Sequence, residues 1–159
     1  MPNPRRKYVV AIDFDGTLVT LLPTGSYPKC GKWLKNARRF LRWLGYQPSI
    51  ERVLWTCRIG PALDVALDYM EKDGFGRDWW HGVNESAPSV GKWMTHCSRK
   101  IFANMYIDDR GFGSGAGAFG FNFPHVVEHI IADMESEKIP VKAVPLPWHP
   151  YNDPEEDRQ

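Results

Sequence analysis

The sequence predicts an α/β protein built on an open, mostly parallel, Rossmann-like sheet with helices on both faces. Short apolar runs at 8–13, 50–56 and 103–108 are typical of buried strands. Between them, apolar residues recur at helical spacing. Strands that alternate with helices along a chain usually pair in parallel, because each helix carries the chain back across the sheet.

Glycine and proline mark the ends of the expected helices. Apolar residues at 33–44 have helical spacing, and Gly45 is a natural stop. A second helix is expected to open at Gly60-Pro61 and to close by Gly74, and a third to open at Pro124.

The remaining segments are expected to be loops or short elements of one domain. Pro and Gly punctuate 21–31, glycines crowd 111–120, and 79–83 has the composition of a short strand. The chain of 159 residues fits a single domain at 1–140, followed by an extended, partly disordered tail at 141–159.

Composition narrows the class of protein. The formal net charge is +1, so there is no overall attraction to nucleic acid or membrane, and no apolar run is long enough to span a bilayer. Three cysteines without a CxxC pair predict reduced thiols rather than a disulfide framework. We therefore expect a cytoplasmic protein.

Polar groups follow three of the predicted strands at their carboxyl ends. Asp13 and Asp15 stand two residues apart after the first strand, so both should project to the same side. Thr56 ends the second strand, and Asp108 and Asp109 end the third. Because ligands of open α/β sheets bind beyond the carboxyl ends of the strands, these groups are expected to converge on one crevice.

The residue types at this crevice predict a metal and a phosphate. Four carboxylates repel one another unless a cation lies between them. Oxygen ligands without His or Cys favour Mg²⁺ over Zn²⁺. A hydroxyl at Thr56 and an ammonium at Lys100, with Lys92 as the rival lysine, suit a phosphoryl group, which needs its charge neutralised.

These residues resemble, in order and spacing, the four motifs of the haloacid dehalogenase-like superfamily of phosphohydrolases. DFDGTL at 13–18 resembles the first motif, Thr56 the second, Lys100 the third and Asp108-Asp109 the fourth. The stretch KIFANMYIDDRGFG is most similar to small members without a cap domain, and intervals of about forty residues between motifs leave no room for a full cap. The resemblance covers about residues 8–135.

The resemblance implies a Mg²⁺-dependent phosphomonoesterase. Asp13 would be the nucleophile that forms an aspartyl phosphate, and Asp15 the general acid and base. Thr56 and Lys100 would bind the phosphoryl oxygens, and Gly16 would allow the backbone to approach them.

It also implies a metal site made of oxygen atoms. The ligands would be the side chains of Asp13 and Asp108, the backbone carbonyl of Asp15, and Asp109 either directly or through water. Thr17 would brace the turn that follows the first strand.

Two other patterns have simpler explanations. Gly115-x-Gly117-x-x-Gly120 matches a dinucleotide fingerprint but does not open directly into a helix, so a mobile loop is expected. HVVEH at 125–129 matches a zinc-protease string, but too little chain follows it for a third ligand and a cleft.

Two alternative functions remain open. A basic stretch at 32–44 and the Trp79-Trp80-His81 run are the features that would suit a polynucleotide-end phosphatase, as base-stacking and polyanion-binding groups. The simpler explanations are a helix face exposed to solvent for the basic stretch and packing in the core for the tryptophan run. The alternative from another class is a non-catalytic scaffold, against which the repelling Asp13 and Asp15 pair argues.

Overall fold

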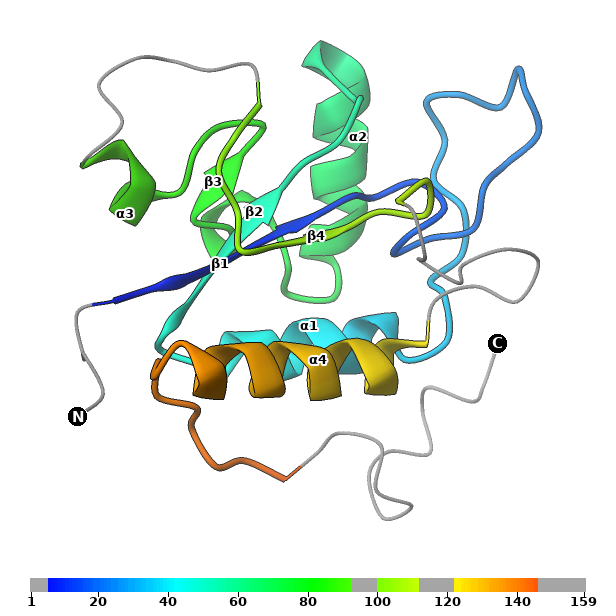
Figure 1. Cartoon of the computed structure of the whole chain (residues 1–159). Coiled ribbons are helices and arrows are strands. Elements are labelled where there is room, and N and C mark those ends of the chain that lie inside the picture. The colour runs from blue at the N-terminus through cyan, green and yellow to red at the C-terminus, as the bar shows by residue number, and fades with distance from the viewer. Residues whose placement is uncertain (1–5, 93–99, 112–121, 146–159) are drawn as a thin grey trace.

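The structure is a computed structural model that describes residues 6–92, 100–111 and 122–145 (Figure 1). One sheet is present in this part of the chain, made of β1 (Tyr8–Ile12), β2 (Ile50–Leu54), β3 (Gly82–Val83) and β4 (Met105–Ile107). Its strand order is β3-β2-β1-β4, and every neighbouring pair is parallel. The predicted open, parallel α/β fold is confirmed.

Helices cover both faces of this sheet, as predicted. The helices are α1 (Ala37–Gly45), α2 (Gly60–Glu71), α3 (Pro88–Gly91) and α4 (Phe123–Ser136), with a 3-10 turn, η1, at Arg77–Trp79. Alternate β1 residues, such as Val10 and Ile12, share a hydrophobic core with α1, α2 and α4. Val9 and Ala11 point to the opposite face and pack against α3.

The C-terminal helix is held against the first helix. Figure 1 shows α1 and α4 side by side on one face of the sheet, and the rings of Phe40 and Phe123 stack with centroids 5.0 Å apart. The Tyr8 hydroxyl donates to Asp133 Oδ2 at 2.5 Å, which joins β1 to α4.

The first helix begins later than its apolar spacing predicts. The prediction places Trp33 in the helix, but Trp33 forms a bridge with Val19 and donates its indole N–H to Asp73 Oδ2 at 3.0 Å. Asn36 then adopts a left-handed backbone conformation (φ 65°) immediately before Ala37. Tertiary pairing of Trp33 therefore overrides the local helical pattern.

No second sheet or helical insertion is present between β1 and α1 in the described residues. The chain from 13 to 36 forms turns and two isolated bridges, and residues 141–145 have no regular structure. Most of the predicted glycine-rich loop and most of the predicted tail lie outside the described residues. Among the helices of the described part, none is long and apolar enough to cross a membrane.

Candidate active site

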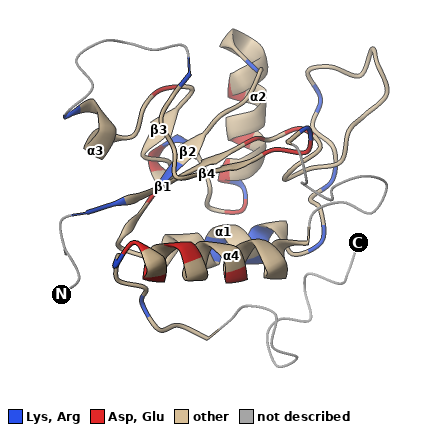
Figure 2. Ribbon diagram, in the orientation of Figure 1, with Lys and Arg blue, Asp and Glu red and all other residues tan. Residues whose placement is uncertain are grey.

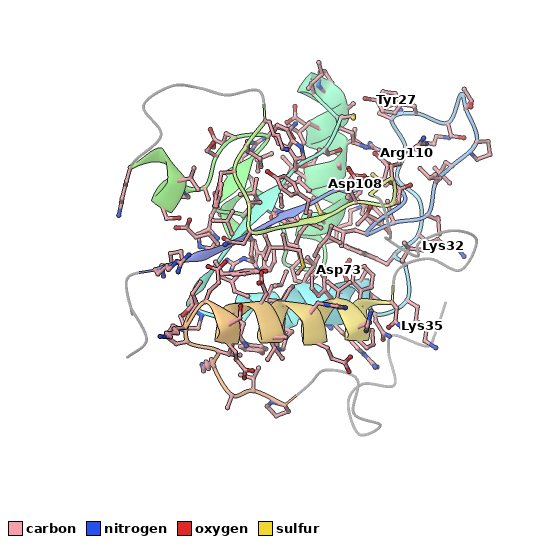
Figure 3. The ribbon with its side chains drawn as sticks, in the orientation of Figure 1. Tyr27, Lys32, Lys35, Asp73, Asp108 and Arg110 are labelled. Atoms are coloured by element: carbon pink, nitrogen blue, oxygen red, sulfur yellow. The ribbon has the colours of Figure 1, made fainter. Side chains whose placement is uncertain are left out.

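Three of the predicted carboxylates converge at the carboxyl edge of the sheet. One oxygen each from Asp13, Asp108 and Asp109 lies within 4.8 Å of the others. The cause is the parallel pairing of β1 with β4, which the Asp13 N–H extends by donating to the Ile107 carbonyl at 2.9 Å. Figure 3 labels Asp108 and Arg110 at this edge, and Figure 2 shows acidic residues at the loop that follows β4.

Mutual repulsion and burial make this cluster unfavourable when it carries full negative charge. Desolvation, with Asp108, Asp109 and Asp15 adding charge repulsion, raises the pKa of Asp13 to about 7. Burial and the charge of Asp108 also raise the pKa of Asp109. A divalent cation would remove this penalty, and a donor set of oxygens alone fits Mg²⁺. The three carboxylates therefore fit the predicted ion.

The turn after β1 is packed directly against Asp109. Gly16 has φ 77°, and a Cβ placed on it would meet Asp109 Oδ2 at 2.5 Å. The buried Thr17 hydroxyl accepts a hydrogen bond from the Asp109 N–H at 3.0 Å. The close approach that Gly16 permits is thus to Asp109, and its expected role beside a phosphate stays a prediction.

Asp15 lies outside the three-carboxylate group and pairs instead with Arg58, a residue that the sequence analysis did not single out. Arg58 Nε donates to Asp15 Oδ2 at 2.7 Å, and Nη2 donates to Oδ1 at 2.8 Å. Arg58 is only 2% exposed. Its position two residues beyond Thr56, at the same edge of the sheet, was the one available sequence signal.

Thr56 has the hydroxyl that the prediction requires, at the end of β2. Its Oγ1 accepts a hydrogen bond from the Arg58 N–H at 3.2 Å, and its own N–H donates to Asn84 Oδ1 at 2.9 Å. The Asn84 side chain also donates to the Arg58 carbonyl at 2.9 Å. Because Oγ1 is used here as an acceptor, its O–H is the group that could donate to a phosphoryl oxygen.

Lys100 is placed beside β4. Its Nζ lies 6.0 Å from the ring centroid of Tyr106. Tyr106 is in β4, two residues before Asp108. Lys92 is exposed just after α3. The role of Lys100 toward a phosphoryl group stays a prediction.

The two neighbouring tryptophans make packing contacts. The Trp79 and Trp80 rings meet edge to face at 4.8 Å, and the Trp80 indole donates to the Phe75 carbonyl at 3.0 Å. Arg52 lies over the Trp79 ring, 4.3 Å from its centroid. His81 Nδ1 accepts from the Arg52 N–H at 3.1 Å. These contacts within the protein agree with a packing role for the Trp79-Trp80-His81 run.

The structure describes the basic stretch and the two histidines of α4, but not the glycine pattern that the sequence analysis named. Within the basic stretch, Arg38 forms an ion pair with Asp73 at 2.9 Å. His125 and His129 lie on one exposed side of α4 with their Nε2 atoms 3.0 Å apart. The Gly115-x-Gly117-x-x-Gly120 pattern lies outside the described residues.

Comparison with known proteins supports the fold and leaves the activity open. No protein-family model matches the chain, and no curated protein matches its sequence. A solved structure of a conserved protein from Bacteroides thetaiotaomicron is similar, with a TM-score of 0.58 and 28% sequence identity. The match covers 85% of this chain and 94% of that one. The two chains share an α/β fold.

Proposed function

We propose that this protein is a Mg²⁺-dependent phosphomonoesterase that works through an aspartyl phosphate on Asp13. The observation that carries the proposal is the convergence of Asp13, Asp108 and Asp109 within 4.8 Å at the ends of two adjacent parallel strands. Such a site costs stability unless it holds a cation, and a cation held by a nucleophilic carboxylate suits phosphoryl transfer.

The ion would be held by the side chains of Asp13, Asp108 and Asp109 together with the backbone carbonyl of Asp15. When bound, Mg²⁺ supplies positive charge that offsets the negative charge of a phosphoryl group. Asp13 is our candidate nucleophile because it is the cluster carboxylate that directly follows β1, at the position that the resemblance assigns to the nucleophile.

The reaction divides between two aspartates. A carboxylate oxygen of Asp13 attacks phosphorus, and the ester oxygen leaves with its bonding pair and takes a proton from Asp15. In the second step a water oxygen attacks the phosphoryl group and gives its proton to Asp15. The bond between phosphorus and Asp13 breaks, its electron pair returns to Asp13, and inorganic phosphate leaves.

Thr56 and Lys100 are our candidates for holding the phosphoryl oxygens, by a hydroxyl donor and an ammonium charge. The short 13–36 connection leaves the carboxylate edge without a covering domain in the described residues. An open edge suits a phosphorylated substrate that is itself large. The two described cysteines, Cys30 and Cys57, are free thiols, which suits a reducing, cytoplasmic setting.

The test is phosphate release from sugar phosphates, nucleotides, phosphorylated oligonucleotides and phosphopeptides, with and without Mg²⁺. Asp13→Asn should lower the rate by at least about a hundredfold, since removing a nucleophile usually costs more than that. Asp68→Asn, on the exposed side of α2, is the matched control and should keep full activity. EDTA should stop release and Mg²⁺ should restore it. Turnover that survives Asp13→Asn would refute the proposal.

A further inference from the structure

Arg58 is a buried, fully hydrogen-bonded charged side chain at the carboxyl edge, and the reaction proposed above gives it no role. A guanidinium has five N–H donors. Two of them bond the two oxygens of Asp15. The other three go to backbone carbonyls: Nη1 to Pro28 at 2.6 Å and to Ala62 at 3.3 Å, and Nη2 to Lys29 at 3.0 Å. Every donor therefore has an acceptor.

The backbone bonds make this guanidinium a fixed point. Pro28 and Lys29 belong to the loop before α1, and Ala62 lies in the first turn of α2, so three carbonyls from two segments hold the group. The guanidinium carbon also lies over two aromatic rings, 5.1 Å from the centroid of Phe14 and 5.3 Å from that of Tyr27. Because three backbone carbonyls also hold this buried side chain, its position does not depend on Asp15 alone.

Asp15, by contrast, is oriented through Arg58. The two parallel N–H···O bonds set both the position and the plane of its carboxylate. The Asp15 side chain is still 33% exposed, so it is held by Arg58 and remains within reach of solvent. A group that takes a proton from water needs a fixed orientation, because small errors in its position are costly in rate. It also needs access to that water.

We propose that Arg58 is a positioning residue that holds the Asp15 carboxylate where it takes the proton of the hydrolytic water. This inference rests on the proposed function. The step it serves is attack of water on phosphorus of the phosphorylated Asp13, with the water proton passing to Asp15 and the bonding pair returning to Asp13. Arg58 touches no reacting atom in this scheme and acts through Asp15 alone.

A positioning role for Arg58 can be distinguished from a loss of structure, because the two would affect the two steps of the reaction differently. With p-nitrophenyl phosphate the leaving group departs readily, so the first step needs little help from Asp15. Loss of the Asp15 orientation should therefore slow hydrolysis of the phosphoenzyme and spare its formation. The expected result is a burst of one p-nitrophenolate per enzyme, followed by slow turnover, with phosphorylated Asp13 accumulating.

The experiment is rapid-quench kinetics on Arg58→Lys, which keeps the charge but cannot form the paired bonds. We expect the burst, with a steady-state rate about a hundredfold below that of the wild type, the usual cost of a misplaced catalytic group. Arg58→Gln, which removes the charge, should give the same pattern and serves if the lysine variant does not fold. Adding Arg58→Lys to Asp15→Asn should cause no further loss.

Arg52→Lys is the matched control. Arg52 is a partly buried arginine of β2 that also donates to backbone carbonyls, those of Trp79 and Leu44, and packs on an aromatic ring. Its replacement should lower stability and leave the kinetics without a burst.

The outcomes are distinct. An Arg58→Lys enzyme without a burst, or one whose defect adds to that of Asp15→Asn, overturns the positioning role while the wild type still turns over. A wild type that shows no Asp13-dependent turnover overturns the proposed function and this inference together.

Discussion

The Thr17 hydroxyl accepts a 3.0 Å hydrogen bond from the backbone N–H of Asp109, and this bond joins the turns that follow β1 and β4. Thr17 is fully buried, so no water can replace its hydroxyl without a rearrangement. The bond therefore couples the position of one carboxylate in the cluster to the turn after the other strand.

Thr17→Val should loosen that coupling. The variant keeps the shape of the side chain but leaves the Asp109 N–H without its acceptor, which costs about 1–3 kcal/mol of unfolding free energy. Calorimetric titration should also show weaker Mg²⁺ binding, because Asp109 is no longer fixed. Thr17→Ser restores the acceptor and should recover most of the affinity; equal affinity in all three proteins would show that the bond does not position Asp109.

Gly16→Ala should displace Asp109 from the carboxylate cluster through a clash rather than through backbone strain alone. The added methyl would lie 2.5 Å from Asp109 Oδ2. Gly25 is the matched control, since it also has a positive φ (98°) but has open space around its Cβ position. Both alanine variants should lose about 1 kcal/mol of stability from the backbone. Only Gly16→Ala should lose Mg²⁺ binding, and titration of the two proteins side by side checks this.

The pKa of Asp13, raised from the ordinary 3.8 of an aspartate to about 7, predicts an unusual pH dependence of stability without metal. The folded protein binds the Asp13 proton more tightly than the unfolded chain does. The Asp13 contribution is therefore fully present below pH 4 and is lost as the pH rises to 7. Asp13→Asn should consequently stabilise the metal-free protein at pH 8 by about 1–3 kcal/mol.

Urea unfolding in EDTA at pH 5 and pH 8 measures this effect. At pH 5, where the folded Asp13 is still mostly protonated, the difference between the wild type and Asp13→Asn should be smaller than at pH 8. Mg²⁺ should stabilise the wild type at pH 8 more than the variant. A variant less stable than the wild type at pH 8 in EDTA would contradict the assignment of repulsion to this cluster.

Lys100→Ala should lower turnover by about a hundredfold if its ammonium neutralises the phosphoryl group, as loss of one charge-stabilising donor typically does. Lys92→Ala is the matched control, because Lys92 is also exposed and precedes the same strand. Steady-state kinetics on both variants distinguishes the two lysines. A larger loss in Lys92→Ala would transfer the role to that residue.

The fold and the clustering of Asp13 with Asp108 and Asp109 were accessible from the sequence for a local reason. Asp13 and Asp108 each follow a short apolar strand directly, and parallel pairing brings the carboxyl ends of such strands to one edge. The residues that form the periodic pattern of one strand or helix are close together in the chain. Their spacing therefore predicted the positions of β1, β2, β4, α2 and α4 closely. The short α3 has too few residues for any period to appear.

The start of α1 and the role of Arg58 depend on contacts between distant residues. Trp33 has the spacing of a helical residue, yet its partners are Val19 and Asp73. Arg58 is 43 residues from Asp15 and about 30 from the carbonyls of Pro28 and Lys29. Residue type and spacing carry no information about such pairings.

The sequence by itself determined that acidic side chains would follow two strands of a parallel sheet, because period and order are local properties of the chain. Only the tertiary structure decided that these acids divide into two groups, with Asp13, Asp108 and Asp109 facing one another and Asp15 facing Arg58. The physical reason is that backbone pairing of β1 with β4 brings the first three acids together, despite their repulsion. Asp15 meets Arg58 because the carbonyls of Pro28, Lys29 and Ala62 hold that guanidinium beside it, and how these loops pack is not written in the order of residues.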